Sequence, residues 1–174
     1  MKPDLETGTS APARRLTPSH DPAVIARPLR HGDVRTVLGI FDRLGERSRR
    51  HRFNGPKPCL SRSELRRLAT VDAERQALVA YLEDDPRPIG IARLVRDGDR
   101  AEIAVAVVDE HQRRGIGSAL VSELFADARA AGITELTALV SAGNAAALEL
   151  LRRVAKAVTV RYEGTELSIR AAIG

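Results

Sequence analysis

The most constraining part of the sequence is residues 101–117, where an apolar run, a polar turn and a helical pattern follow one another directly. The apolar run AEIAVAVV predicts a strand, and the turn after it contains Gln112, Gly115 and Gly117 in the spacing Gln-x-x-Gly-x-Gly. Glycines let the backbone approach a ligand and turn its N–H groups toward it. The N-terminus of the following helix adds unpaired donors and a partial positive charge. Together with the two arginines inside the turn, these features predict a pyrophosphate-binding site.

Two better-known phosphate loops do not fit this segment. The dinucleotide fingerprint needs three glycines in the spacing G-x-G-x-x-G, and Ser118, Ala119 and Leu120 supply no third glycine. The nucleoside triphosphate loop ends in Gly-Lys-Ser/Thr, and no lysine lies nearby. The segment instead resembles motif A of the GNAT superfamily of N-acetyltransferases, written Gln/Arg-x-x-Gly-x-Gly/Ala. The resemblance implies that this loop holds the pyrophosphate of acetyl-coenzyme A (acetyl-CoA), the acyl donor.

The order of elements predicted by the hydrophobic pattern agrees with this resemblance. The pattern predicts a strand, two helices, three strands, a helix, a strand, a helix and two strands. The predicted strands are residues 23–30, 76–83, 88–96, 101–108, 134–140, 158–162 and 166–169. The predicted helices follow Asp33, start at Ser61 with Glu64 completing a capping box, and span residues 116–131 and 145–154. Residues 45–58 are predicted to be a basic loop.

Similarity to the superfamily over residues 25–169 implies an α/β fold of the GNAT type. In that fold a mixed, mostly antiparallel central sheet carries helices on both faces and is splayed between its fourth and fifth strands. Those strands would be residues 101–108 and 134–140, and the pantetheine arm would enter the cleft between them. We expect one such domain at residues 23–174 and a disordered tail at residues 1–22, which are rich in Pro, Ser, Thr, Ala and charge.

Matching the motif to this chain assigns site residues by position. The resemblance implies coenzyme binding by Val107, Val108, Gln112, Arg113, Arg114, Gly115, Ile116, Gly117, Ser118 and Asn144. Backbone groups of Val107 and Val108 would pair with pantetheine and the thioester carbonyl, which makes the Val107 N–H the oxyanion donor. Asn144 is also a good helix N-cap, so both roles stay open for it. Without a ligand, the loop would simply be a solvated turn followed by a helix start.

Acetyl transfer to an amine requires a base, because most amines are protonated at neutral pH. Glu102 is the best candidate, since regular alternation places it beside Ala104 and Ala106, where it would be poorly solvated. The segment AEIAV around it also resembles the Ala-Glu-apolar-Ala-apolar segment of Pat-type bacterial protein lysine acetyltransferases, in which the Glu is the general base. Alternatively, Glu102 ends a strand and pairs with Arg93 or Arg100.

The sequence departs from the superfamily pattern at the group that protonates the leaving thiolate. Many members carry a Tyr seven residues after the Asn, and that position is Leu151 here. Tyr162 could replace it only if the fold brings it to the thiol, and a water molecule is the other option. His51 and His111 are interpreted as surface residues. No Cys/His cluster has metal spacing, so no metal is expected.

Composition bounds the partners of the protein. The net charge of +5 is compatible with a polyanionic partner, but acidic and basic residues are interspersed and aromatics are only 3%, so nucleic acid is not expected. No apolar run approaches the ~20 residues that cross a bilayer, no apolar signal segment is present, and there is one cysteine, Cys59, which together predict a cytoplasmic protein. The preference for Arg over Lys and the many alanines are typical of a high-GC bacterial genome.

These observations predict an N-acetyltransferase that moves an acetyl group from acetyl-CoA to a primary amine in a ternary complex. The meander hairpin and the loop at residues 45–58 should line the acceptor channel, and their charge is mixed or basic. This favours a protein lysine in an acidic context, or an acidic metabolite, over a polyamine or aminoglycoside. A non-catalytic acyl-CoA-binding regulatory module is a second hypothesis, since it would keep the glycine loop without a base. A nucleic-acid binder that uses the basic tail and the arginines of residues 47–52 is a third hypothesis. The oligomeric state is left open, with a homodimer as one option.

Overall fold

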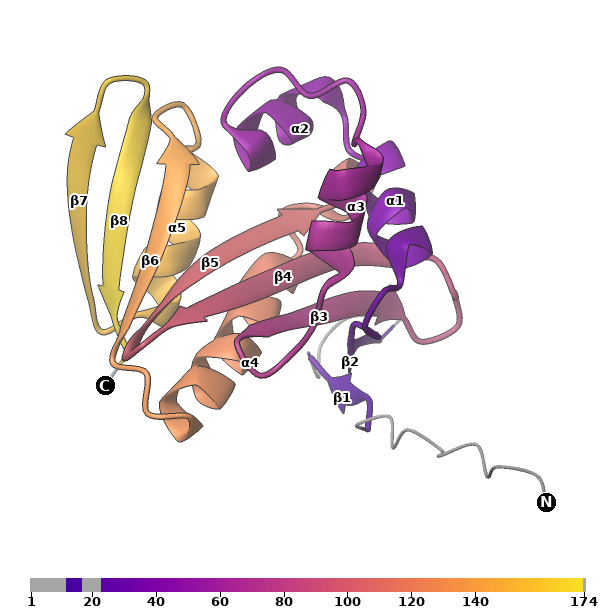
Figure 1. Cartoon of the computed structure of the whole chain (residues 1–174), viewed down its shortest axis with the longest axis horizontal. Coiled ribbons are helices and arrows are strands. Elements are labelled where there is room, and N and C mark those ends of the chain that lie inside the picture. Colours follow the sequence, from indigo (N-terminus) through magenta and orange to yellow (C-terminus); the bar gives the residue numbers. More distant parts are fainter. Residues whose placement is uncertain (1–11, 17–22, 174) are drawn as a thin grey trace.

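The computed structural model describes residues 12–16 and 23–173 of the chain, which form an eight-stranded sheet covered by helices (Figure 1). The strand order is β1-β2-β3-β4-β5-β6-β8-β7. The strands are β1 Arg14–Arg15, β2 Val24–Pro28, β3 Arg75–Leu82, β4 Pro88–Asp97, β5 Arg100–Val107, β6 Glu135–Ser141, β7 Ala157–Glu163 and β8 Glu166–Ala172. The helices are α1 Val34–Asp42, α2 Glu46–Phe53, α3 Arg62–Ala69, α4 Ile116–Ala130 and α5 Ala145–Val154, with a 3-10 turn at Asp109–His111.

The helices lie in two layers, one on each face of the sheet (Figure 1). Alternate residues of a strand point to opposite faces, so a strand covered on both sides must be apolar throughout. In β3, Leu78 and Ala80 are buried in the large core beneath α4, whereas Ala77 and Val79 are buried in a smaller core beneath α1 and α3. This double burial explains the unbroken apolar run that predicted β3.

The sheet is antiparallel except between β5 and β6, which run parallel and separate along their length. They pair at only three positions, and the last pair is Glu102 with Thr137. Both strands continue past this pair, to Val107 and Ser141, and diverge (Figure 1). The mixed, mostly antiparallel sheet with its opening between these two strands is confirmed.

The structure differs from the sequence-based expectation at α2, because residues 45–58 were expected to form a loop. The sequence of α2, ERSRRHRF, has no apolar stripe, which is why periodicity did not predict a helix. Tertiary contacts stabilise it instead: Arg49 donates to the carbonyls of Phe41 and Asp42, and the Phe53 ring meets the Phe41 ring edge-on at 5.8 Å.

A second difference lies in the segment expected to be a disordered tail. Arg14 and Arg15 form β1, which pairs with Ala26 and Ile25 of β2. Arg14 also forms ion pairs with Glu123 and Asp127 of α4, at 3.1 and 3.0 Å. The parts of the expected tail at residues 1–11 and 17–22 lie outside the described residues.

The capping box predicted at the start of α3 is confirmed and gives a pH-dependent contribution to stability. The Ser61 side chain accepts from the Glu64 N–H, and the Glu64 carboxylate accepts from the Ser61 N–H at 2.9 Å and from Lys57. The bond from Lys57, followed by those from Ser61, lowers the pKa of Glu64 to about 2.

We therefore expect Glu64→Gln to reduce the pH dependence of unfolding. Because the folded pKa is depressed, the contribution of the carboxylate is present above the unfolded pKa of about 4.3 and disappears as the pH falls toward about 2. In urea unfolding, the stability difference between wild type and Glu64→Gln should be larger at pH 6 than at pH 2.5. Glu74→Gln, at an exposed glutamate before β3, is the control. An equal difference at both pH values would contradict the prediction.

Candidate active site

The end of β5 presents backbone groups to the opening between β5 and β6. The Val108 N–H donates to the Ile89 carbonyl of β4 at 2.9 Å. Neighbouring residues of a strand direct their N–H groups to opposite edges, so the Val107 N–H points away from β4, toward β6. Because pairing between β5 and β6 ends at Glu102, this N–H lies at the unpaired edge of β5. The geometry therefore suits a donor to a ligand in the opening.

The turn after β5 is held by Gln112. Its Nε2 donates to the Val107 carbonyl at 2.9 Å, to Ser48 Oγ of α2 at 3.0 Å and to the Asp109 carboxylate at 3.2 Å. The Gln112 side chain thus fixes the shape of the turn, and its amide donor is engaged by protein atoms. Any contribution to a phosphate site would come through the loop geometry that it maintains.

The next residues combine positive charge with unusual backbone conformations. Arg113 has a φ of 62°, in the left-handed region, and Gly115 has a φ of 78°. Both Arg113 and Arg114 are exposed, and neither side chain forms a hydrogen bond or ion pair within residues 12–16 and 23–173. Two uncompensated guanidinium groups therefore flank the start of α4, where they could pair with a pyrophosphate.

The N-terminus of α4 lacks a side-chain cap. Asp33, Ser61 and Asn144 cap α1, α3 and α5 with their side chains, whereas Gly115, the N-cap of α4, has no side chain to accept a bond. The first N–H groups of α4 have no partner inside the helix and are available to phosphate oxygens. Two further residues assigned to coenzyme binding lie in the first turn of α4. Ile116 is 2% exposed and belongs to the core, so only its backbone can contribute to a ligand site. The Ser118 side chain is half-buried.

Gly117 sets how closely α4 approaches α5. A Cβ at this position would lie 3.0 Å from Leu150 Cδ1 of α5 and 3.6 Å from Val107 Cγ2.

Asn144, at the start of α5, caps that helix by accepting from the Ala147 N–H at 3.2 Å. Its capping role is thereby confirmed, and its side-chain NH₂ has no partner among the described residues.

Glu102 lies at the last pair before β5 and β6 separate. The two ion pairs that would have given it a structural role are not formed. Arg93 donates to the carbonyls of Leu68 and Thr70, and Arg100 pairs with Glu135 at 3.3 Å. The carboxylate has no hydrogen bond or ion pair in the described parts of the chain. Glu102 is exposed, however, and the enclosure expected from alternation with small apolar residues is not observed.

Arg52 lies in the segment expected to line the acceptor channel, but it was not among the predicted site residues. It lies on α2, which contacts both β5 and β6 and so spans the opening between them. Desolvation, followed by the positive charge of Arg93, lowers the pKa of Arg52 to about 10, while the nearby charge of Glu102 raises it. Its guanidinium lies 5.1 Å from the centre of the Phe53 ring and has no hydrogen-bond or ion-pair partner among the described residues. Only the docking of α2 brings Arg52 to Glu102.

Residues 46–155 match the model of the acetyltransferase (GNAT) family. The chain belongs to this family. GNAT acetyltransferases use acetyl-CoA, so the protein is an acetyl-CoA-dependent N-acetyltransferase. The uncapped start of α4 with its two arginines is compatible with the phosphate site that the motif predicts.

Relatives of this GNAT acetyltransferase are bacterial. An acetyltransferase of Pseudomonas aeruginosa is 30% identical over 132 residues, which are 73% of this chain and 71% of that protein. Acetyltransferase Pat of Mycolicibacterium smegmatis is 35% identical over 155 residues, which are 79% of this chain but 42% of Pat. The chain therefore spans less than half the length of that relative.

Solved structures agree with the family assignment. The GNAT domain of S. lividans PAT has a TM-score of 0.77 at 26% identity, covering 86% of this chain and 90% of that domain. Spermidine N-acetyltransferase from Vibrio cholerae, in complex with CoA and spermine, has a TM-score of 0.66 at 17% identity, covering 86% of this chain and 95% of that one. The first likeness supports the Pat-like assignment, and the second shows the shared fold.

The remaining predicted positions of the GNAT site fall as follows. Leu151 is 4% exposed in the core, so the position that many members fill with Tyr is an apolar packing position here. Tyr162 is 78% exposed on β7, the edge strand, two strands away from β6. His111 was expected at the surface, but its side chain is only 13% exposed and burial lowers its pKa.

No described helix could span a bilayer, and residues 12–16 and 23–173 contain no His/Cys/Asp/Glu group suited to a metal ion.

Proposed function

We propose that this acetyltransferase acetylates the ε-amine of a protein lysine, with Glu102 as the general base and the Val107 N–H as the oxyanion donor. The observation that carries the proposal is the unpartnered Glu102 carboxylate at the point where β5 and β6 separate. A base must be accessible to a bulky acceptor and free of ion pairs that would hold its negative charge, and Glu102 meets both conditions.

In this proposal the acceptor and acetyl-CoA are bound together. Glu102 accepts a proton from the lysine ammonium, and the neutral nitrogen attacks the thioester carbon. A C–N bond forms while negative charge develops on the thioester oxygen, where the Val107 N–H donates to it. The C–S bond then breaks, and the second proton that the attacking nitrogen must lose passes through water to the thiolate, because Leu151 has no proton to give. Glu102 releases the first proton to solvent, so the products are the amide, the free thiol and one proton. Arg113, Arg114 and the first turn of α4 hold the pyrophosphate throughout.

The choice of a protein lysine over a polyamine rests on charge. A polyamine carries several positive charges and is best bound by carboxylates, whereas Arg52 of α2 lies near enough to Glu102 for its positive charge to act there. The segment AEIAV around Glu102, which resembles that of Pat-type protein lysine acetyltransferases, supports the same acceptor class, and relatives of the Pat type are similar to this chain.

The test is acetyl-CoA-dependent thiol release across a panel of acceptors. The panel contains lysine peptides and folded lysine proteins on one side and spermidine and an aminoglycoside on the other, with coenzyme binding measured by calorimetry. We expect turnover with protein or peptide lysines about tenfold above that with the small cations. A tenfold ratio corresponds to about 1.4 kcal/mol, which two or three unfavourable charge contacts of roughly 0.5–1 kcal/mol each would supply. Faster turnover of spermidine would replace the lysine proposal, and coenzyme binding without turnover would favour a regulatory module.

A further inference from the structure

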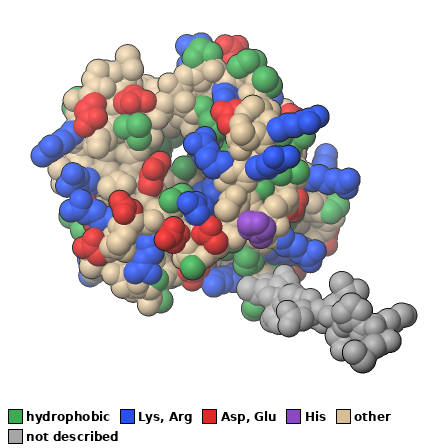
Figure 2. All heavy atoms as spheres, in the orientation of Figure 1, with side chains coloured by type: hydrophobic (Ala, Val, Ile, Leu, Met, Phe, Trp, Pro, Cys, Tyr) green, Lys and Arg blue, Asp and Glu red, His purple; other side chains and the backbone are tan. Residues whose placement is uncertain are grey.

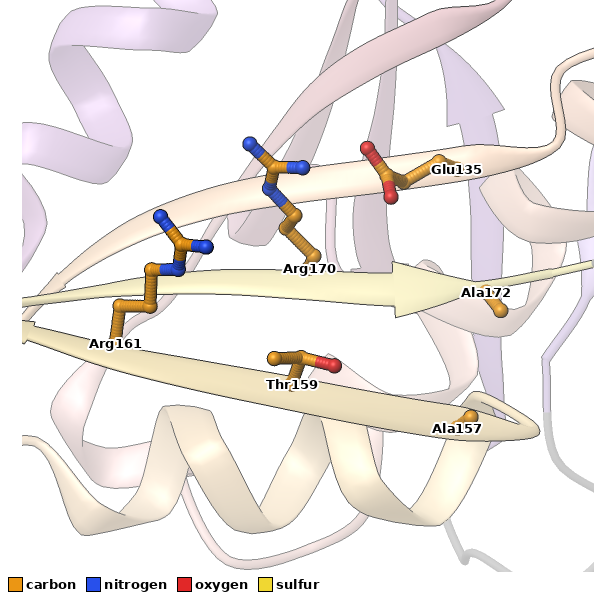
Figure 3. A pocket seen from close by; sticks show the side chains of 6 residues that line it. All are labelled: Glu135, Ala157, Thr159, Arg161, Arg170 and Ala172. Carbon is orange, nitrogen blue, oxygen red and sulfur yellow. The ribbon is translucent and has the colours of Figure 1, made fainter.

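A pocket of about 240 Å³ lies on the sheet surface formed by β6, β8 and β7 (Figure 3). It is lined by Glu135, Ala157, Thr159, Arg161, Arg170 and Ala172. The pocket lies on the same face of the sheet as Glu102. Leu136 of β6 and Ile169 of β8 are buried in the core on the opposite face, and the pocket residues Glu135 and Arg170 alternate with them along these strands.

The pocket contains two uncompensated positive charges. Arg170 is opposite Thr159 in the β7–β8 register, and Arg161 is two residues further along β7, so the two arginines are diagonal neighbours. Figure 3 shows their side chains leaving the strands on the same side. Neither guanidinium forms a hydrogen bond or an ion pair within the described residues. Two like charges held this close together favour an anion between them.

The other polar residues of the pocket are compatible with an anionic ligand. Glu135 is the acidic residue of the lining, and Arg100 of β5 compensates its charge at 3.3 Å. The Thr159 hydroxyl has no partner in the described parts of the chain and lies opposite Arg170, where it can donate to the same ligand.

The pocket lies within reach of a peptide whose lysine is at Glu102. Glu102 is opposite Thr137, and Thr137 is opposite Arg170, so two strand spacings separate Glu102 from Arg170. This corresponds to about 10 Å between their Cα atoms. An extended peptide advances about 3.3–3.6 Å per residue, so a residue about three positions from the lysine lies over the arginines.

We infer that Arg161 and Arg170 form a docking site for an acidic side chain, Asp or Glu, about three residues from the acceptor lysine. This inference rests on the proposed acetylation of protein lysines. A nucleic-acid backbone fits less well, because it requires a continuous row of cations, whereas acidic and basic side chains are interspersed over this face (Figure 2). Glu163 and Glu166 continue the same two strands beyond Arg161 and Arg170, so the positive region is local.

Binding of labelled peptides in the presence of coenzyme A tests the inference directly. One peptide carries a central lysine with Glu at positions −3 and +3, and its partner carries Gln at both. We expect wild type to bind the Glu peptide about tenfold more tightly, because two exposed ion pairs each contribute a few-fold. In Arg161→Gln/Arg170→Gln the difference should fall to about twofold or less. Arg152→Gln/Arg153→Gln, which removes two exposed arginines of α5, should leave it unchanged.

Equal binding of the two peptides by wild type, or a difference that survives in Arg161→Gln/Arg170→Gln, would overturn the docking site. The charge-reversed Arg170→Glu should in turn prefer a peptide with Arg at positions −3 and +3.

Thiol release on the same peptides separates this inference from the proposed function. Equal turnover of both peptides with equal affinity contradicts only the docking site, whereas selective binding without turnover contradicts lysine acetylation and retains the site.

Discussion

Glu102→Gln should lower kcat by about 10²- to 10⁴-fold and leave the affinity for acetyl-CoA unchanged. The factor is the usual contribution of a positioned general base. Glutamine has nearly the same shape as glutamate but cannot accept the ammonium proton. Glu102 is exposed and has no partner among the described residues, so its replacement should not disturb the fold. The measurements are thiol release at saturating acceptor and calorimetric titration of the coenzyme.

The pH profile distinguishes loss of a base from a general disturbance of the site. Without a base, the reaction depends on the small fraction of acceptor amine that is already neutral, which grows until the pH reaches the lysine pKa of about 10.4. The defect of Glu102→Gln should therefore shrink steadily between pH 7 and pH 10. Glu149→Gln, at an exposed glutamate of α5, should match wild type at every pH. A defect that is independent of pH, or one accompanied by weaker coenzyme binding, would argue against the base.

Gly117→Val should weaken acetyl-CoA binding by about 5- to 150-fold. Even a Cβ at this position would lie 3.0 Å from Leu150 Cδ1 and 3.6 Å from Val107 Cγ2, and valine adds two methyl groups to it. Overpacking of this kind typically costs about 1–3 kcal/mol, which corresponds to the stated range in affinity. The first turn of α4 must move away from α5 to relieve the contact, and its N–H groups then no longer converge on the pyrophosphate.

A graded series tests that explanation. Gly117→Ala should have a smaller effect than Gly117→Val, because the atom met at 3.0 Å is the end of a flexible leucine side chain. Gly55→Val is the matched control, since nothing lies within 4 Å of a Cβ built there. Equal coenzyme affinity in Gly117→Val and Gly55→Val would show that close packing at Gly117 is not needed for the phosphate site.

The turn between β5 and α4 was predictable from the sequence because every signal for it is local. A strand, a Gln-x-x-Gly-x-Gly turn and a helix occur within residues 101–130, and each has its own short-range pattern. The same holds for the capping box at Ser61 and for most of the remaining elements. The structure adds that the Gln112 side chain holds the turn rather than presenting its amide donor to a ligand, which the motif alone does not indicate.

The acceptor side could not be predicted in the same way, because its residues are far apart in sequence. Arg52 is brought toward Glu102 by α2, a helix without an apolar stripe that depends on contacts such as those between Arg49 and the carbonyls of Phe41 and Asp42. The spacing of polar and apolar residues in α2 is the same as that expected of a solvated basic loop, so the sequence alone does not show this helix.

The sequence by itself determined the family, most of the helices and strands and the turn before α4, since periodicity, capping and glycine spacing act over a few residues. Only the tertiary structure decided what surrounds Glu102. It directs Arg93 and Arg100 to other partners and leaves the carboxylate unpaired, and it places Arg170 two strands away on the same face. The physical reason is that strand register and helix docking depend on burial summed over the whole core, which no local pattern encodes.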